Sequence, residues 1–381
     1  MPLALALTAP TRSWSSIELR LRAPSPEPVE LRFGQRSVTL EQPTIVHRGH
    51  AFFRCRFDEL PNDSRFEARA HQPATGEVAE LTTTTLPRLP GARKLRLGVL
   101  ADTHLTLDRA SIDDYRPGTR RLYGLSAELT ERYLCRLEEL GAEAIVLLGD
   151  LVDPCTQQSL EVLRSLFEQR GVPCYPIIGN HEPWTPGGEA RFYETLGLPR
   201  GGYYSVDLPE LRLLMLSTPS PESLSDGSEQ RRWLQEQLES TPPNLDVALF
   251  SHFSLLLHPC VQGHRNDGYQ LLSDHRSLLA LLGRFPNVRL FAAGHKNVPS
   301  RVLSGHTLHT LSAQLIQAPC GYEMFDFCHG GLARISYEID EQHYAEVARA
   351  AYEREGALRF GTPEDRCFVW TYSVDGRSAE R

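Results

Sequence analysis

Potential metal ligands follow five apolar segments of the sequence, each at the point where the segment ends. The segments are short and rich in Leu, Val, Ile and Ala, as is typical of strands buried in a sheet. In open α/β sheets, sites form at the carboxyl ends of the strands, so we expect these side chains to lie together. The five runs are Asp102-Thr103-His104, Gly149-Asp150-Leu151-Val152-Asp153, Gly179-Asn180-His181-Glu182, Ser251-His252 and Gly294-His295-Lys296-Asn297.

These side chains suit two divalent cations and a phosphorylated substrate. Carboxylate, imidazole and amide ligands together favour Mn, Fe, Co or Zn over Ca or Mg. Two divalent ions carry more positive charge than two aspartates cancel, and the excess suits the oxygens of a phosphoryl group. Paired metals about 3.5–4 Å apart can hold such a group and supply a hydroxide for in-line attack. These ligand types are therefore compatible with metal-assisted chemistry on a phosphoryl group.

The ordered set of motifs resembles the calcineurin-like metallophosphoesterases. Their pattern runs D-x-H, G-D-x-x-D, G-N-H-D/E, H and G-H-x-H, and the resemblance covers residues 95–300. It implies an α/β fold, a four-layer α/β/β/α sandwich, in which two divalent ions share one aspartate. It implies a first metal held by Asp102, His104 and Asp150. The second metal would be held by Asp150, Asn180, His252 and His295.

The catalytic roles implied by this resemblance belong to His181 and Asp153. His181 would protonate the leaving alkoxide while a metal-bridging hydroxide attacks phosphorus, and Asp153 would orient the imidazole. Each residue also has a structural alternative, a histidine at a turn and an aspartate that caps a helix. The position of His181 within Gly-Asn-His-Glu, directly after an apolar strand, favours the catalytic role.

At two points the sequence differs from known family patterns, and both differences concern the metal site. Asn297 stands where G-H-x-H has its second His, which the resemblance implies as a further ligand of the first metal. An amide oxygen is a weaker ligand than an imidazole, so we predict that one of the two metal positions is weak. His306 and His309 are alternative ligands further along the chain. Asp153 and His104 stand where purple acid phosphatases have other residues, so a purple ferric centre is not expected.

The nearer relatives implied by the motifs are bacterial cyclic-nucleotide and glycerophosphodiester phosphodiesterases. Ser228–Leu234 is similar to their Q-x-x-W-L helix, whereas Pro154-Cys155 replaces the Arg-Gly of serine and threonine phosphatases. We therefore predict a metal-dependent phosphoesterase acting on a phosphodiester or a small phosphorylated metabolite. The alternatives are a phosphomonoesterase or a nuclease of the same fold, and a scaffold protein with weakened catalysis.

Substrate recognition is expected from loops beside the motifs. Leu105–Leu122 is longer than a connection from strand to helix needs, and its arginines suit phosphate oxygens. We predict that Arg116 in this segment, and His264 and Asn266 in a later loop, contact the substrate. An ordinary solvated loop is the alternative for Leu105–Leu122. Trp184 is expected to pack in the core, with stacking on a ring of the substrate as the alternative.

The first 90 residues have a different pattern from the rest and predict a small all-β sandwich. Leu60–Ala68 resembles the corner before strand F of fibronectin type III domains, with Phe66 in place of the usual Tyr. We predict a fibronectin type III-like domain over 1–90 and a catalytic domain over 91–381. The role of the first domain stays open between a spacer, an oligomerisation surface and a wall of the active-site cleft. The strand-like segments are Ile17–Arg22, Val29–Phe33, Ser37–Leu40, Ala51–Phe57, Phe66–His71 and Glu77–Leu86.

Composition limits the remaining classes of protein. The 381 residues carry a net charge of −8, which argues against binding of nucleic acids or anionic membranes. No apolar run approaches the roughly 20 residues of a membrane span, and the apolar start lacks the basic residues of a signal peptide. The eight cysteines form no C-x-x-C pair. We therefore expect a cytoplasmic protein with a small-molecule phosphoester substrate; homo-oligomer formation is left open.

Overall fold

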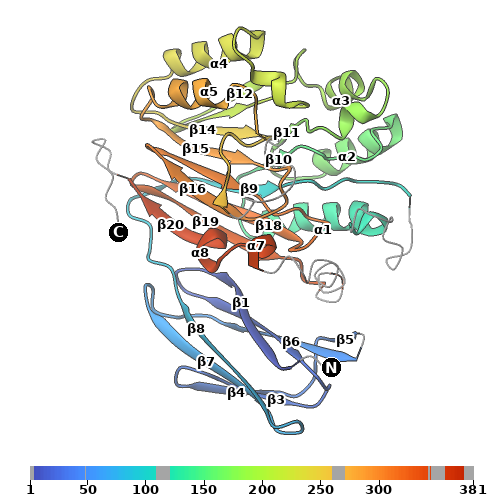
Figure 1. The fold of residues 1–381 in the computed structure, drawn as a ribbon, viewed down its shortest axis with the longest axis vertical. Helices are drawn as coiled ribbons and strands as arrows, with labels where there is room; N and C mark the ends of the chain where they lie inside the picture. Colours follow the sequence, from blue (N-terminus) through green and yellow to red (C-terminus); the bar gives the residue numbers. More distant parts are fainter. Residues whose placement is uncertain are drawn as a thin grey trace.

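In the part of the chain that the structure describes, the strands form four sheets, two of four strands and two of six (Figure 1). The computed structural model describes residues 4–47, 49–108, 121–259, 271–341, 344 and 357–372. The four-stranded sheets contain only strands that precede residue 85, and the six-stranded sheets only strands that begin at Arg93 or later. The predicted domain boundary between residues 90 and 91 falls in the segment that joins these two groups of strands.

Eight strands make up the N-terminal part: β1 (Ala6–Arg12), β2 (Ile17–Ala23), β3 (Val29–Phe33), β4 (Arg36–Leu40), β5 (Ile45–His47), β6 (His50–Phe57), β7 (Arg65–Gln72) and β8 (Glu77–Thr84). The sheets have the strand orders β1-β2-β6-β5 and β4-β3-β7-β8 and share one apolar core. Buried and exposed residues alternate along β3, as expected for a half-buried strand. The ring of Phe33 stacks on those of Phe57 and Phe66, with centroids 4.4 and 4.9 Å apart. Phe66 thus packs with the core aromatic rings.

The first large sheet contains β9 (Arg93–Leu100), β10 (Ala144–Leu148), β11 (Cys174–Ile177), β18 (Gly321–Cys328), β19 (Gly331–Glu338) and β20 (Cys367–Thr371). The second contains β12 (Tyr204–Leu208), β13 (Leu211–Met215), β14 (Asp246–Ser251), β15 (Val288–Ala293), β16 (Ser300–Ser304) and β17 (Thr307–Leu311). Their orders are β11-β10-β9-β18-β19-β20 and β12-β13-β14-β15-β17-β16. Strands β9, β10 and β11 run parallel, as do β13, β14 and β15. The carboxyl ends of each parallel set therefore share one edge of a sheet.

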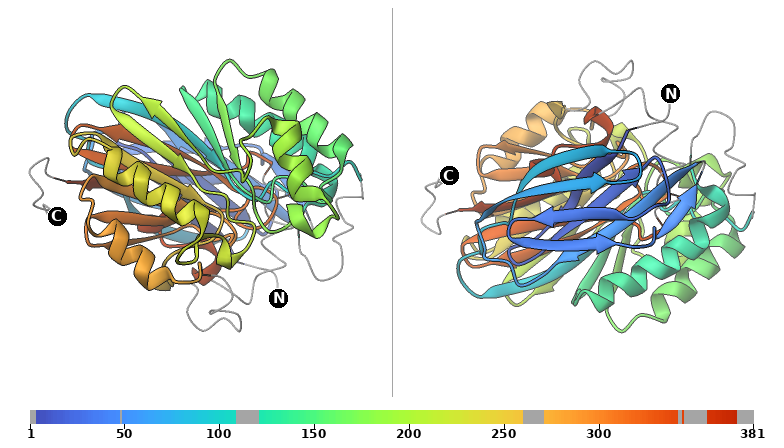
Figure 2. Two further views of the ribbon diagram at one scale, coloured as in Figure 1. Left: turned by 90° about the horizontal axis from the view of Figure 1, so that it is seen from above. Right: turned by 90° about the horizontal axis from the view of Figure 1, so that it is seen from below.

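Helices cover the outer faces of the two large sheets, which confirms the predicted four-layer α/β/β/α arrangement (Figures 1 and 2). One apolar core lies between the sheets, one under α1, α2 and α3, and one under α4 and α5. Every residue of β10 is buried, as its continuous apolar sequence predicts. The helices are α1 (Ser126–Glu139), α2 (Gln157–Glu168), α3 (Gly188–Leu196), α4 (Glu229–Ser240), α5 (His275–Leu282), α7 (Ala357–Phe360) and α8 (Pro363–Arg366), with single turns η1 (Tyr123–Leu125), η2 (Glu182–Trp184) and η3 (Pro221–Leu224).

The N-terminal sandwich packs on the outside of the first large sheet, at β19, β20 and α8 (Figure 1). Thr11 donates from Oγ1 to the carbonyl of Ser336 at 3.1 Å, and Arg12 donates from Nη2 to the carbonyl of Pro363 at 2.8 Å. Trp14 packs against an apolar cluster that includes Ile335. The sandwich thus forms a covering layer over the part of the sheet that α1 and α2 leave open.

A network of ion pairs reinforces this contact. Glu18 on β2 binds Arg20 at 2.8 Å and Arg54 at 2.6 Å. Arg20 then reaches across to Glu338 at the end of β19, at 3.2 Å. Glu18, Arg20 and Glu338 have side chains that are at most one tenth exposed. Because burying a charge without a partner is costly, these pairs fix how the sandwich sits on the sheet.

Several elements differ from the sequence-based expectation. Strand β18 was not predicted because Glu323 and Asp326 interrupt its apolar pattern. In the fold, Glu323 pairs with Arg334, and Asp326 binds Arg96 at 2.7 Å. Strand β17 ends at Leu311, where the chain turns towards β18. Among the described residues, no helix is both long and apolar enough to cross a membrane.

Candidate metal centre

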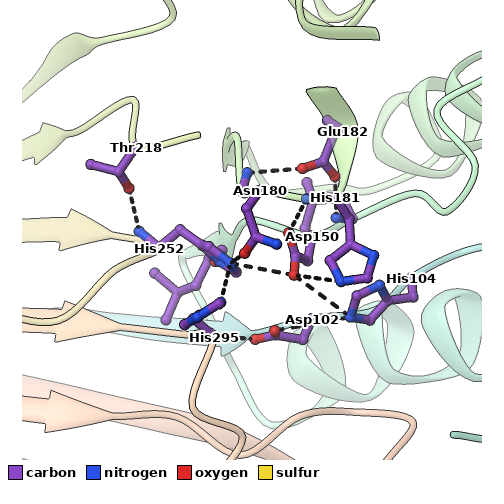
Figure 3. Close-up of polar contacts among 12 residues, drawn as sticks. Asp102, His104, Asp150, Asn180, His181, Glu182, Thr218, His252 and His295 are labelled. Atoms are coloured by element: carbon purple, nitrogen blue, oxygen red, sulfur yellow. Dashed lines mark hydrogen bonds and ion pairs between the residues drawn. The ribbon is translucent and has the colours of Figure 1, made fainter. Parts of the chain in front are cut away.

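The predicted ligands lie together where parallel strands of both large sheets end (Figure 3). In the first sheet, β9, β10 and β11 lead to Asp102, Asp150 and Asn180. In the second sheet, β14 and β15 lead to His252 and His295. The ends of five strands thus bring together side chains that are far apart in the sequence, as the motif positions predicted.

One group of candidate ligands consists of Asp102, His104 and Asp150. The Nε2 atom of His104 lies 4.0 Å from Oδ1 of Asp102 and 3.8 Å from Oδ2 of Asp150. One ligand atom from each of the three residues lies within 4.8 Å of the others. All three side chains are buried. This is the set that the resemblance implies for the first metal.

A second group contains Asp150, His252 and His295, again with ligand atoms within 4.8 Å of one another. The Nε2 atom of His252 lies 3.3 Å from Oδ2 of Asp150 and 3.0 Å from Oδ1 of Asn180. Nδ1 of His295 lies 3.2 Å from the same Nε2 atom. Asp150 belongs to both groups, so its position fits an aspartate shared by two cations.

Several buried polar atoms at the site have no hydrogen-bond partner among the described residues, as expected for atoms that bind a metal. Five atoms of predicted ligands are buried and have no hydrogen-bond partner among the residues that the structure describes: Asp102 Oδ1, His104 Nδ1, His104 Nε2, His295 Nε2 and Asn297 Oδ1. An unsatisfied buried polar atom costs roughly 1–3 kcal/mol, so folded proteins rarely keep several of them. Carboxylate, imidazole and amide donors of this kind are ligands of divalent metals. The residues present therefore fit the two-metal site that the resemblance implies.

Electrostatics in the cluster also favour a cation. Burial raises the pKa of Asp102 to about 6 and lowers that of His104 to about 3. Burial would lower the pKa of His252 as well, but the charge of Asp150 raises it to about 9. Both carboxylates have lost their hydration, and a bound cation would offset that cost.

The backbone of five predicted ligands is left-handed. The φ angles are 51° at Asp102, 39° at His104, 51° at Asp150, 64° at His295 and 61° at Asn297. In the described part of the chain, nine non-glycine residues have positive φ, and more than half of them are these ligands. Left-handed backbone is costly for most L-residues and collects at functional sites. The strain thus coincides with the candidate centre.

Two motif glycines let the strand ends approach each other. A Cβ atom on Gly149, which has a φ of 82°, would lie 2.7 Å from Nδ1 of His252. A Cβ atom on Gly179 would overlap Oδ1 of Asp150 and lie 2.9 Å from Cε1 of His252. Glycine is required at both positions because the ligands pack directly against the backbone.

Glu182 links the two loops that carry Asp150 and Asn180. Its buried carboxylate accepts hydrogen bonds from the backbone N–H groups of Leu151, of Val152 at 3.2 Å and of Gly179 at 2.9 Å. Burial and the nearby Asp150 raise the pKa of Glu182 to about 7. Glu182 belongs to the motif Gly179–Glu182, but its role could not be predicted from the sequence because that role depends on the distance between two loops.

Thr218 and Leu148 orient His252. Oγ1 of Thr218 accepts a hydrogen bond from the backbone N–H of His252 at 2.8 Å. Nδ1 of His252 donates to the carbonyl of Leu148, also at 2.8 Å, which leaves Nε2 facing Asp150. Partners of this kind fix the tautomer of a metal-binding histidine. No motif in the sequence pointed to Thr218.

His181 lies beside the cluster with its two ring nitrogens in different surroundings. Nδ1 is 2.9 Å from Oδ2 of Asp153, which also accepts a hydrogen bond from the hydroxyl of Tyr123 at 2.9 Å. Nε2 lies 3.7 Å from Oδ2 of Asp150 and faces the centre. Asp153 also lies 3.6 Å from Nδ1 of His104, so it contacts both histidines. The hydrogen bond at Nδ1 orients the ring and leaves Nε2 available to a substrate.

The structure describes some of the remaining predicted residues and not others. Asn297 is buried two residues after His295. Arg116, His264 and Asn266 lie outside the described residues, so their predicted substrate contacts stay predictions. The expectation that Trp184 packs in the core is wrong, since it is 66% exposed.

The alternative ligands His306 and His309 lie away from the two groups. Nε2 of His306 lies 3.4 Å from the carbonyl of Leu282, and the ring of His309 stacks on Phe291 with centroids 5.6 Å apart. Neither histidine therefore takes part in the clusters described above.

A family comparison covers most of the two large sheets. The model of the family described as "Calcineurin-like phosphoesterase" matches residues 95–308. This segment contains all five ligand-bearing motifs and is more than half of the 381 residues.

Two curated proteins are similar to this chain. A probable glycerophosphodiester phosphodiesterase from Arcobacter nitrofigilis is 28% identical over 167 residues, which are 42% of this chain and 59% of that protein. A probable cyclic nucleotide phosphodiesterase from a Synechococcus strain is 26% identical over 211 residues, 54% of this chain and 74% of that protein. The first match thus spans less than two thirds of the length of the relative.

A solved structure shares the fold. A dimetal phosphatase from Danio rerio superposes with a TM-score of 0.51 at 18% identity, covering 64% of this chain and 96% of that structure. At this level of identity, the likeness concerns the arrangement of sheets and helices.

Proposed function

Because the chain belongs to the calcineurin-like phosphoesterase family, we propose that it is a hydrolase of phosphoric esters that cleaves small phosphodiesters with the help of two divalent metal ions. The observation that carries this proposal is the pair of ligand groups that share Asp150 beside Nε2 of His181. The names of the two curated relatives support a diester as the substrate. The ligand chemistry favours Mn, Fe, Co or Zn as the ions.

The metals would be held by the five residues of the two groups, Asp102, His104, Asp150, His252 and His295, together with Asn180. Bound ions supply positive charge for the phosphoryl oxygens and make water nucleophilic at neutral pH. The amide of Asn297 is the candidate for a further, weaker ligand.

His181 and Asp153 would handle the proton of the leaving group. Water attacks phosphorus, the bond from phosphorus to the leaving oxygen breaks, and Nε2 of His181 gives its proton to that oxygen. Asp153 accepts the hydrogen bond from Nδ1, so the ring keeps the orientation in which Nε2 faces the centre. The carboxylate also stabilises the imidazolium that exists before the proton is transferred.

The experiment compares bis-p-nitrophenyl phosphate with p-nitrophenyl phosphate after reconstitution of the metal-free protein with Mn, Fe, Co, Zn or Mg. We expect turnover of the diester that a chelator abolishes. Turnover of the monoester alone would replace the proposal with a phosphomonoesterase. No turnover with any of the metals would favour a scaffold.

A pair of matched variants tests the site itself. Asp150→Asn removes the shared carboxylate and is expected to abolish both turnover and the binding of one metal. Asp207→Asn changes an exposed aspartate that pairs with Arg212 at 2.6 Å on the surface, and it should leave both unchanged. Equal loss of turnover and metal binding in the two variants would contradict the assignment of Asp150 as a shared metal ligand.

A further inference from the structure

Trp184 presents a largely exposed indole beside His181. Its ring centroid lies 3.8 Å from that of His181, with the planes inclined by 38°. Two hydrogen bonds hold the chain at Trp184 in place. The backbone N–H of Trp184 donates to the carbonyl of His181 at 3.2 Å, and Oγ1 of Thr185 accepts from the backbone N–H of Cys155 at 2.9 Å. A tryptophan that is 66% exposed next to a candidate catalytic residue offers a flat apolar surface to a ligand.

Arg121 approaches the same histidine at its Nε2 atom. Nη1 of Arg121 lies 3.5 Å from Nε2 of His181 and donates to the hydroxyl of Tyr123 at 3.0 Å. The hydroxyl in turn donates to Asp153, so the arginine and the histidine are positioned by one connected set of contacts. Nε of Arg121 is buried and has no hydrogen-bond partner in the described part of the chain.

These contacts place two recognition groups around one reacting atom. The leaving oxygen must lie near Nε2 of His181, within reach of the guanidinium of Arg121. A guanidinium is suited to the oxygens of a phosphate. A group attached to that oxygen would come close to Trp184, whose ring centroid lies 3.8 Å from that of His181, and a planar ring there would gain stacking energy.

We propose that Arg121 and Trp184 form a leaving-group subsite for a phosphoester that carries a planar ring, such as a nucleoside or an aryl group. This inference rests on the proposed function, since it takes His181 as the donor to the leaving oxygen. Arg121 binds the phosphate and Trp184 stacks on the ring. Substrates with a flexible alkyl leaving group use only the first of these contacts.

Equilibrium binding separates the two contacts without relying on turnover. AMP and ribose 5-phosphate, which differ by the planar base, are titrated calorimetrically into the Mn-loaded protein. We expect AMP to bind roughly tenfold more tightly, as stacking of one base allows. In Trp184→Leu the preference should disappear while the affinity for ribose 5-phosphate stays the same. Trp184→Phe should keep most of the preference.

Two further variants complete the design. Arg121→Gln should weaken both ligands by the same factor, because it removes a contact with the phosphate alone. Trp233→Phe is the matched control, since Trp233 packs against Tyr203, 4.9 Å between centroids, and takes no part in the clusters of the site. It should change neither affinity.

The outcomes distinguish this inference from the proposed function. Equal binding of the two ligands, or equal loss of both in Trp184→Leu, would overturn the subsite even when bis-p-nitrophenyl phosphate is still hydrolysed. The latter result would make Trp184 a support for the ring of His181. A preference for AMP that depends on Trp184, in a protein that hydrolyses neither nitrophenyl ester, would uphold the subsite and overturn the proposed function.

Discussion

Oδ2 of Asp153 lies 2.9 Å from Nδ1 of His181, on the side of the ring that faces away from the shared ligand Asp150. The carboxylate also accepts a hydrogen bond from Tyr123 and lies close to His104. It therefore connects the candidate proton donor to the first group of candidate ligands, so that changes at either one are felt by the other.

Replacing His181 should separate chemistry from metal binding. His181→Asn is expected to lower kcat by about 10²- to 10⁴-fold, the usual contribution of a general acid, while both metals stay bound. Asp153→Asn should lower kcat less, by about 10- to 100-fold, because it weakens the orientation and the charge stabilisation of the ring but leaves the proton donor in place. Steady-state kinetics and elemental analysis of the purified variants measure both effects. Loss of metal in His181→Asn would assign this histidine to the ligands.

A single methyl group at Gly179 should disrupt the second group of ligands. The added Cβ atom would overlap the carboxylate of Asp150 and contact His252, and the surrounding backbone leaves no space for it. We expect Gly179→Ala to lose at least one metal ion and most of the activity.

The matched control for this variant is Gly171→Ala. A Cβ atom there would meet only Oε1 of Glu138, at 3.4 Å, which is close to ordinary contact. Metal content and melting temperature of both variants are compared with those of the wild type. If Gly179→Ala kept both metals, the close packing of the glycine against Asp150 would be irrelevant to the site.

Asn297→His should strengthen the weaker of the two metal positions. The amide oxygen of Asn297 is buried without a partner in the part of the chain that the structure describes, and an imidazole restores the family pattern. We expect the wild type to bind two Mn ions with unequal affinity. The variant should bind the weaker one roughly tenfold more tightly, a gain of about 1.4 kcal/mol. Calorimetric titration measures both affinities, and two equally tight sites in the wild type would contradict the prediction.

His309 should make the protein less stable in acid. Burial, together with the nearby His258, lowers the pKa of His309 to about 3, whereas an unfolded histidine has its ordinary value near 6.5. Below pH 6.5, His309 therefore binds a proton in the unfolded chain but stays neutral in the folded chain. The free energy of unfolding thus falls as the pH drops towards 3.

Replacing His309 by leucine should remove its contribution to the pH dependence of the free energy of unfolding. Between pH 6.5 and 5, the wild type should lose up to about 2 kcal/mol more stability than His309→Leu. Urea denaturation at the two pH values gives the difference. The same pH dependence in both proteins would show that His309 is already protonated in the folded state.

Much of the fold was accessible from local sequence patterns. The strand at Val29–Phe33 was predicted with the bounds that the structure has, because its residues alternate cleanly. The apolar segment before Gly149 was recognisable as a buried strand because it is continuously apolar. Helix α3 and strand β18 were missed. The first is short, and the second contains acidic residues whose arginine partners come from other strands.

The candidate site was accessible to the extent that its residues belong to motifs. Ligands at strand ends are recognisable because the fold brings strand ends together. Glu182 and Thr218 act through backbone groups of other loops, and those distances have no counterpart in the sequence. The burial of Trp184 was mispredicted for a similar reason. The residue types around it do not show which side of the single turn η2 faces solvent.

The left-handed backbone at the candidate ligands has a consequence for directed evolution. Glycine at His104 or His295 would relieve the torsional cost, and it would also remove a buried nitrogen that has no partner among the described residues. Selection of a random library for heat resistance alone, in the absence of metal, should therefore enrich such replacements. Stability and activity oppose each other at these positions. Deep sequencing of the survivors would outline the active centre without a single enzyme assay.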